Sequence, residues 1–388
     1  TFGLEGRWTL RLIATDAVGN KNETSVAIDL GVRKNLVKAV ETAPAVFSPN
    51  NDDKREVTNI NFELTDTCDI KIELIDQHGG LKRTHTAQAL SAGTHTVLWD
   101  GKDDAGFIVS DNAYSVKFTA ILSSNTSVNQ VETITVFVDT TPPVVDIKQP
   151  GENSYFKTNI TVSGTVSDQN LVEYSVSYTG NAGTVPLDQA NQSRANYTFG
   201  MLNDLSEGSY TLIVRAKDLG ENETNKTIAF TIDRTPPMVT LDTPKDGEYY
   251  GTLSPAVNSQ QSGVIGITGS IVEKNLEIYT VRYGSGDNPA QWTELLSGSA
   301  VPVSPQLFAW GIGQGAGIVD GLYTVSLFAR DKAGSTAEAR VKVTVDNTPP
   351  ETSIAVPIDG DYIKAIIDIK GTAFDQNFDK YTLEISEG

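Results

Sequence analysis

The chain has 388 residues and a formal charge of −19, from 30 basic and 49 acidic side chains. This length predicts several compact units rather than one core. The acidic balance makes nucleic acid and anionic membrane surfaces poor partners, and no apolar run reaches the roughly 18 residues needed for membrane insertion. One cysteine and three histidines leave no internal disulfide and little for a zinc site. Because no basic, apolar leader opens the sequence, we expect a mature or excised fragment.

Apolar and polar residues alternate in three similar segments, the first of which runs from Trp8 to Ala14. The other two start at Tyr210 and Tyr323, and a looser copy starts at Tyr114. A period of two predicts a half-buried strand. Each of the three strands leads into an acidic turn and a second strand, which predicts a β-hairpin. The turns are residues 16–20, 218–222 and 331–335.

Two further repeats divide the chain. Linkers with the sequence Asp-x-Thr-Pro-Pro are expected to be stiff joints, because proline pairs lack N–H donors and cannot continue a sheet. Segments that end in Asp/Glu-x-Asn predict a strand followed by an acidic loop. Helix-period segments are essentially absent, so the predicted fold class is all-β, with tandem immunoglobulin-like sandwiches in an elongated array. The linkers are residues 139–143, 233–237 and 346–350, and the strand segments are 164–170, 269–275 and 371–377.

The stretch around Asp320 and Tyr323 resembles strand F of the bacterial immunoglobulin-like (Big-type) modules of secreted and surface proteins. The resemblance implies a tyrosine corner at Tyr323, and it places Val325 and Leu212 where antibody domains carry a cysteine. Residues 44–122 resemble more specifically the Ig-like module of the flagellar hook-capping protein family. The matching segments are residues 47–52, 70–76, 79–80, 92–93 and 99–106, and Asp53 stands where that family has a glycine.

The repeats predict three complete modules and two partial ones. Residues 1–32 are expected to be the C-terminal part of an Ig-like module, and residues 351–388 the N-terminal part of another. The complete modules are residues 33–143, which form the hook-cap type, and residues 144–237 and 238–350.

No catalytic motif is visible, and we expect no enzyme. The Gly-rich stretch 311–317 is not followed by a helix pattern or by Lys-Ser/Thr, and Cys68 lies in a strand pattern that favours a core or solvent-facing position. Seven Asn-x-Ser/Thr sequons mark either glycosylated loops or ordinary turns.

The leading hypothesis is a non-catalytic structural or adhesive spacer of a large extracellular or cell-surface bacterial protein. The alternative is a carbohydrate-binding accessory region of a secreted enzyme, in which exposed aromatic side chains form a platform for glycans. The candidates for that platform are Tyr249, Tyr250, Trp292 and Trp310.

Acidic side chains are expected to meet at the linkers. In an Ig sandwich the B–C and F–G loops share the pole at which the chain enters, so these loops should approach the preceding linker. Oxygen-only ligands would select Ca²⁺ there, and solvated acidic loops with Asx turns are the alternative. The predicted Ca²⁺ ligands are Asp139, Asp168, Asn170, Asp218, Asp233, Glu273, Asn275, Asp331, Asp346, Asp375, Asn377 and Asp16.

The two partial modules are expected to leave apolar faces uncovered, at Trp8, Leu10 and Leu12 and in the stretch 363–369. Either further residues of a longer chain complete both modules, or the tail of one copy pairs with the head of the next in a filament. In the second case Asp16 would join the cluster at residues 346–377. The expected partners are therefore neighbouring modules of the same chain and other copies of it.

Overall fold

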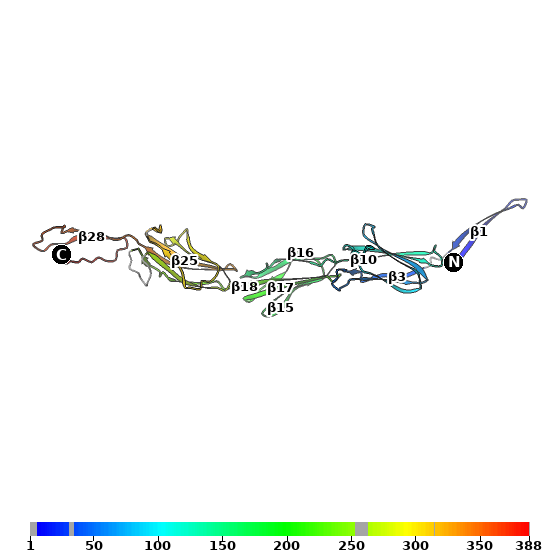
Figure 1. Ribbon diagram of the computed structural model, residues 1–388, viewed down its shortest axis with the longest axis horizontal. Coiled ribbons are helices and arrows are strands. Elements are labelled where there is room, and N and C mark those ends of the chain that lie inside the picture. Colours follow the sequence, from blue (N-terminus) through cyan, green and yellow to red (C-terminus); the bar gives the residue numbers. More distant parts are fainter. Residues whose placement is uncertain (1–5, 31–34, 253–262, 314, 388) are drawn as a thin grey trace. The chain divides into compact units, whose positions relative to one another are not determined.

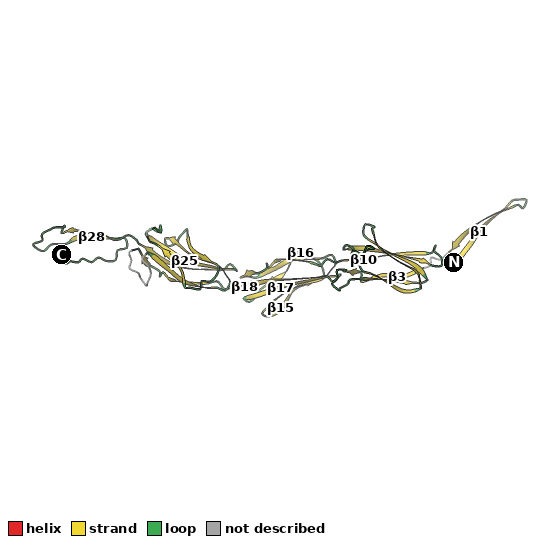
Figure 2. Ribbon diagram, in the orientation of Figure 1, coloured by secondary structure: helices red, strands yellow, loops and turns green. Residues whose placement is uncertain are grey.

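The computed structural model describes residues 6–30, 35–252, 263–313 and 315–387. Within these ranges it contains strands and loops and no helix (Figure 1, Figure 2). The predicted all-β fold of tandem sandwiches is confirmed. The chain divides into two compact units. The first comprises Thr1–Gln149, Val162–Gly200 and Leu212–Thr227, and the second Pro150–Thr161, Met201–Thr211 and Ile228–Gly388.

One sheet topology occurs three times, each time as a three-stranded and a five-stranded sheet. The first pair has the strand orders β3-β5-β8 and β4-β10-β9-β6-β7, and the two later pairs repeat both orders. In all three, the short second strand pairs in parallel with the last strand. The strands of the first pair are β3 (Val37–Ala43), β4 (Val46–Phe47), β5 (Thr58–Leu64), β6 (Cys68–Ile75), β7 (Leu81–Leu90), β8 (Gly93–Trp99), β9 (Asn112–Leu122) and β10 (Asn129–Val138).

The second and third pairs of sheets follow along the chain. The second consists of β11 (Val144–Gln149), β12 (Ser154–Phe156), β13 (Ile160–Ser167), β14 (Leu171–Gly180), β15 (Gly183–Ala190), β16 (Arg194–Leu202), β17 (Gly208–Asp218) and β18 (Glu223–Ile232). The third consists of β19 (Met238–Thr243), β20 (Glu248–Tyr250), β21 (Val264–Val272), β22 (Leu276–Ser285), β23 (Thr293–Gly298), β24 (Gln306–Gly311), β25 (Gly321–Asp331) and β26 (Thr336–Val345).

Side chains from every second strand residue fill the core between the two sheets of the first sandwich. Along β9, Tyr114, Val116 and Phe118 are at most 1% exposed, because every second residue of a strand faces the opposite sheet. The Trp99 ring packs edge-on against Tyr114, with ring centroids 5.5 Å apart. Cys68 is fully buried in the same core, which is one of the two positions that its strand pattern favours.

The tyrosine corner implied by the resemblance is present in all three sandwiches. The Tyr323 hydroxyl donates to the carbonyl oxygen of Val319, four residues upstream, at 2.8 Å. Tyr114 and Tyr210 make the same bond, at 2.6 and 2.9 Å. Val325 is fully buried, so apolar packing replaces the inter-sheet disulfide of antibody domains.

The two ends of the chain form two-stranded sheets with exposed apolar side chains, as predicted. At one end, β1 (Gly6–Thr15) pairs with β2 (Lys21–Leu30), and Leu10 and Leu12 are 65% and 68% exposed. At the other end, β27 (Glu351–Val356) pairs with β28 (Lys370–Phe374). Completion of these sheets, by further residues or by another copy, stays a prediction.

A charged network covers the outer face of the third five-stranded sheet. Glu338 accepts hydrogen bonds from Arg282, Arg340 and Ser326, at 2.8, 2.8 and 2.5 Å. Burial pushes the pKa of Glu338 up, but the three hydrogen bonds outweigh it and lower this pKa to about 2. The charged form of Glu338 therefore stabilises the folded module.

Glu338→Gln is expected to destabilise the third sandwich by about 1–3 kcal/mol at pH 7, because charge-assisted hydrogen bonds are lost. A carboxyl with a lowered pKa stabilises the fold above its ordinary value of 4.5, and this contribution disappears as the pH falls to about 2. Thermal unfolding of both proteins should therefore differ at pH 7 and converge near pH 2. Glu277→Gln, which breaks an exposed pair with Arg330, serves as the control and should change little. A constant difference at all pH values would contradict this assignment.

Candidate functional site

Three carboxylates converge at the first joint, which we define as the linker 139–143 and the two loops that contact it. Asp139 follows β10, Asp168 follows β13, and Asp218 is the last residue of β17. One carboxylate oxygen from each of the three lies within 4.8 Å of those of the other two. Asp139 and Asp218 are buried, with 7% and 1% exposure. The predicted approach of these residues therefore occurs.

The electrostatics of the first joint favour an added positive charge. Burial raises the pKa of the Asp218 carboxyl, and the charges of Asp139 and Asp168 raise it further, although hydrogen bonds from Asn222 oppose the rise. Burial also raises the pKa of Asp168, and Asp139 adds to the shift. Such clustered carboxylates attract a proton or a cation.

Asn170 ties the linker to the acidic loop. Its side-chain Nδ2 donates to Asp139 Oδ2 at 2.6 Å, and its backbone N–H donates to Asp168 Oδ1 at 2.6 Å. Its carbonyl oxygen accepts from the N–H of Leu219 at 2.8 Å. All four residues predicted for this joint thus lie together.

Asn222 is the centre of a set of contacts between residues 48–55 and the turn 218–222, which the sequence did not predict. We call this set of contacts the latch. Its Nδ2 donates to Asp218 Oδ2 at 2.8 Å and to the carbonyl oxygen of Asp139 at 2.9 Å. Its Oδ1 accepts from Ser48 Oγ and Asn50 Nδ2, at 2.7 and 2.9 Å. Asn222 belongs to one of the sequons, but it is 2% exposed, so a glycan has no room there.

A salt bridge completes the latch. Arg55 Nε donates to Glu221 Oε1 at 3.1 Å, and its Nη1 donates to the carbonyl oxygen of Leu219 at 2.7 Å. Glu221 has a φ of +69°, at a turn position where the other two hairpins have glycine. Asp53, in the loop that carries Arg55, has a φ of +66°. Asp53, which stands where the hook-capping family has a glycine, thus adopts the left-handed conformation close to the contact between the two modules.

The second joint, at the linker 233–237, brings together part of the predicted set. Asn275 Nδ2 donates to Asp233 Oδ2 at 2.8 Å, and the Asn275 N–H donates to Glu273 Oε1 at 2.6 Å. Asp331 is fully buried. Among the residues that the structure describes, only the Asp139 group places three carboxylates within 4.8 Å.

The third joint, at the linker 346–350, and the hairpin at Asp16 show fewer of the contacts predicted for a joint. Asn377 Nδ2 donates to Asp346 Oδ2 at 2.8 Å, and the Asn377 N–H donates to Asp375 Oδ1 at 2.6 Å. Asp16 closes the β1–β2 hairpin and accepts from the N–H and Nδ2 of Asn20, both at 2.8 Å. A joint between Asp16 and the Asp346 cluster stays a prediction.

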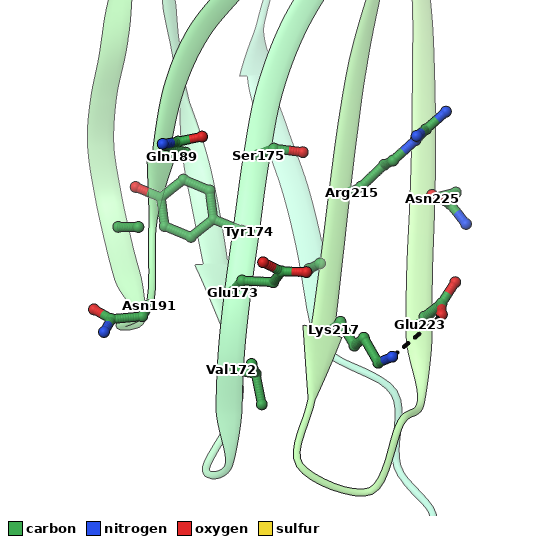
Figure 3. Close-up of a pocket in the computed structure, with 12 residues that line it drawn as sticks. Val172, Glu173, Tyr174, Ser175, Gln189, Asn191, Arg215, Lys217, Glu223 and Asn225 are labelled. Carbon is green, nitrogen blue, oxygen red and sulfur yellow. Dashed lines mark ion pairs between the residues drawn. The ribbon is translucent and has the colours of Figure 1, made fainter. Parts of the chain in front are cut away.

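A shallow depression of about 650 Å³ lies over β14, β15, β17 and β18 (Figure 3). Its wall is polar, with Arg215 and Glu173 on neighbouring strands and Lys217 paired with Glu223 at 4.0 Å. The Tyr174 ring that contributes to it is 2% exposed. The depression therefore lacks the open aromatic face that sugars stack on.

The predicted aromatic platform is wrong for Trp310. This side chain is 3% exposed and stacks on Tyr283 in the core of the third sandwich, with centroids 4.4 Å apart. Trp292 is half-buried, and the guanidinium groups of Arg282 and Arg340 lie 4.5 and 5.1 Å from its ring centroid. The indoles therefore stabilise the module and do not form a shared surface.

Comparison with protein families identifies tandem Ig-like domains across the chain. Residues 48–124 match the FlgD Ig-like domain, and residues 150–234 match a bacterial Ig-like domain. Residues 193–298 match the bacterial Ig-like domain of group 3, a span that crosses the linker 233–237. Domains of these families are typically non-catalytic. The comparison with curated proteins gave no match.

Solved structures that match this chain include three with low sequence identity. The fibronectin(III)-like modules of Clostridium thermocellum CbhA share 17% identity, with 53% of this chain and 95% of that chain covered and a TM-score of 0.33. A tetra-tandem repeat from the extending region of a large adhesion protein shares 16% identity over 89% and 83%, with a TM-score of 0.30. Dimeric latent PorU from Porphyromonas gingivalis shares 11% identity over 78% and 32%, with a TM-score of 0.20.

Asn222→Ala is expected to lower the free energy of unfolding of the module that carries it by about 2–3 kcal/mol, because buried Asp218 and Ser48 lose partners. The urea dependence of hydrogen exchange in residues 144–237 measures the change, because this module has no tryptophan to report its unfolding by fluorescence. Asn225→Ala is the matched control, since Asn225 is exposed on β18, and it should stay within about 0.5 kcal/mol of the parent. Equal effects of the two substitutions would show that the latch contributes nothing.

Proposed function

We propose that this chain, which consists of bacterial Ig-like domains in tandem, is a non-catalytic spacer that holds other parts of a secreted or surface protein apart. The observation that carries the proposal is the first joint. There, Ser48, Asn50 and Arg55 of one module bind the turn 218–222 of the next. A linker held on both sides transmits orientation from module to module instead of acting as a free tether.

The linker sequence supports the same role. Pro142 and Pro143 fix φ and cannot join a sheet, so the linker has few accessible conformations. The carbonyl oxygen of Pro143 also accepts from Thr224 Oγ1 at 2.6 Å. Surface and secreted proteins commonly carry tandem Ig-like domains, which supports a location outside the cytoplasm. Among the described residues, no helix is long and apolar enough to cross a membrane.

Calcium at the first joint is part of this proposal. Calcium binds oxygen ligands at about 2.3–2.6 Å, so two ligands on opposite sides of one ion are about 5 Å apart. The 4.8 Å grouping of Asp139, Asp168 and Asp218 fits that geometry. An ion held there would neutralise a buried acidic cluster and add a further bond between linker and loops.

Small-angle scattering of the full chain is expected to give a maximum dimension close to the summed lengths of its modules. Replacing Pro142 and Pro143 by glycine should broaden the distance distribution and shorten the mean dimension, because glycine restores backbone freedom. The Pro186→Gly variant, which changes a strand residue of β15 outside the linkers, controls for the loss of proline itself. A compact particle for the parent chain would overturn the spacer proposal.

Calorimetry on the chelator-treated full chain is expected to show Ca²⁺ binding. Asp139→Asn should weaken binding at the first joint at least tenfold, because a neutral amide replaces a central carboxylate. Asp146→Asn is the matched control, since Asp146 is an exposed residue of the next strand that pairs with Lys148. No binding heat, together with an unchanged melting temperature on chelation, would contradict the calcium proposal and leave the spacer role intact.

A further inference from the structure

The loop that follows the short second strand differs in length between the first two sandwiches. In the first, residues 48–57 connect β4 to β5, and in the second only residues 157–159 connect β12 to β13. Both loops begin beside the linker to the next module. The N–H groups of Asp139 and Asp233 donate to the carbonyl oxygen of the last residue of the short strand, at 3.0 and 2.9 Å. A long loop at this place can therefore reach the following module.

The loop 48–57 is held in shape by the first sandwich. The N–H of Ser48 donates to the carbonyl oxygen of Arg55 at 2.8 Å, which closes the loop on itself. Pro49 packs against Gly101, where an added Cβ would lie only 2.5 Å from Pro49 Cγ. Because the loop is already ordered, binding the next module costs little conformational entropy.

Ion pairs surround the buried part of the latch. Lys54 Nζ lies 3.3 Å from Glu223 Oε1, and Arg55 Nε lies 3.1 Å from Glu221 Oε1. These pairs are partly exposed and individually weak. Between them lies Asn222, which is 2% exposed and accepts hydrogen bonds from two side chains of the loop. Moving one module away from the other would leave buried polar groups without partners, which is costly.

The shorter loop of the second sandwich makes an exposed contact with the third. Lys157 Nζ donates to the carbonyl oxygen of Gly334 at 2.9 Å. Close to the same joint, Lys332 Nζ lies 5.2 Å from the centroid of the Tyr155 ring. Both lysine side chains are exposed. An exposed lysine gives up conformational entropy when it is held in one place, so these contacts contribute little to the stiffness of the joint.

The turn that receives the loop differs as well. Asn222 ends the turn 218–222 and Ser335 ends the turn 331–335, and each donates its N–H to the aspartate that begins its turn, at 2.9 and 2.8 Å. Serine has no carboxamide, so the second turn lacks the oxygen that accepts from the loop at the first joint. In the described segments 157–159 and 331–335, neither half of the latch is therefore present.

We propose that the latch makes the first and second sandwiches one rigid body, and that the chain bends at the second joint. Both joints keep the bond from an asparagine to the linker aspartate, and both linkers contain a proline pair. The two joints therefore differ in the loop and in the turn that it binds. The inference rests on the spacer function proposed above and adds where along the spacer its direction changes.

Distances between pairs of spin labels on the full chain measure each joint separately. Exposed threonines carry the labels after the substitutions Thr86→Cys, Thr227→Cys and Thr293→Cys, one in each sandwich, while native Cys68 is fully buried and stays unlabelled. The pair across the first joint is expected to give a narrow distance distribution. The pair across the second joint should give one at least about twofold broader, because a hinge samples a range of orientations. Equal widths at the two joints would overturn the inference.

Loss of the latch gives the matched variants. Arg55→Ala and Asn222→Ala should each broaden the distribution across the first joint towards that of the second, and Arg55→Ala keeps the test valid if Asn222→Ala fails to fold. Arg83→Ala is the control, since Arg83 pairs with Asp100 inside the first sandwich, and it should change neither distribution. Lys157→Ala should leave the second joint as it is. A first joint that stays narrow in the latch variants, or a second joint that broadens in Lys157→Ala, would refute the assignment.

The scattering experiment described above separates this inference from the spacer function. An extended chain with equal label distributions at the two joints would support the spacer and refute the inference. A compact chain with a narrow first joint and a broad second joint would refute the spacer and support the inference.

Discussion

The buried linker aspartate is the residue on which the described joints depend. Asp139 and Asp233 are 7% and 5% exposed, and an asparagine of the following module donates to each. Burying a carboxylate is costly unless its hydrogen bonds are made within the protein. The loops that supply those bonds must therefore stay in place, and the linker aspartate of one module becomes part of the structure of the next.

The strands and the joint residues could be predicted because the repeats encode them. Alternation in segments such as 114–120 follows from the pleat, which sends every second side chain to the core. The meeting of Asp139 with Asp168 follows from topology alone, since both loops lie at one pole of the sandwich. These inferences needed only local pattern and the fold class.

The latch could not be predicted in the same way. Ser48 and Arg55 lie 174 and 166 residues from their partners, and they occur at one joint only, so no repeat marks them. The position of Trp310, a platform candidate only under the carbohydrate-binding alternative, was left open for another reason. Its strand, β24, is joined to β21 with a register shift at Ile267 and Thr268, and such an irregularity hides which face a side chain takes. Composition alone does not distinguish a core indole from a surface one.

The parallel pairing of the short second strand with the last strand has a mechanical consequence. The chain enters each sandwich through β3, β11 or β19, continues into the short strand β4, β12 or β20, and leaves from β10, β18 or β26, with which that short strand pairs. A pulling force along the chain therefore slides these neighbouring strands past each other and loads their hydrogen bonds together in shear. An antiparallel pair at the same place would open one bond at a time. Each module thus resists tension where its N-terminal segment pairs with its last strand.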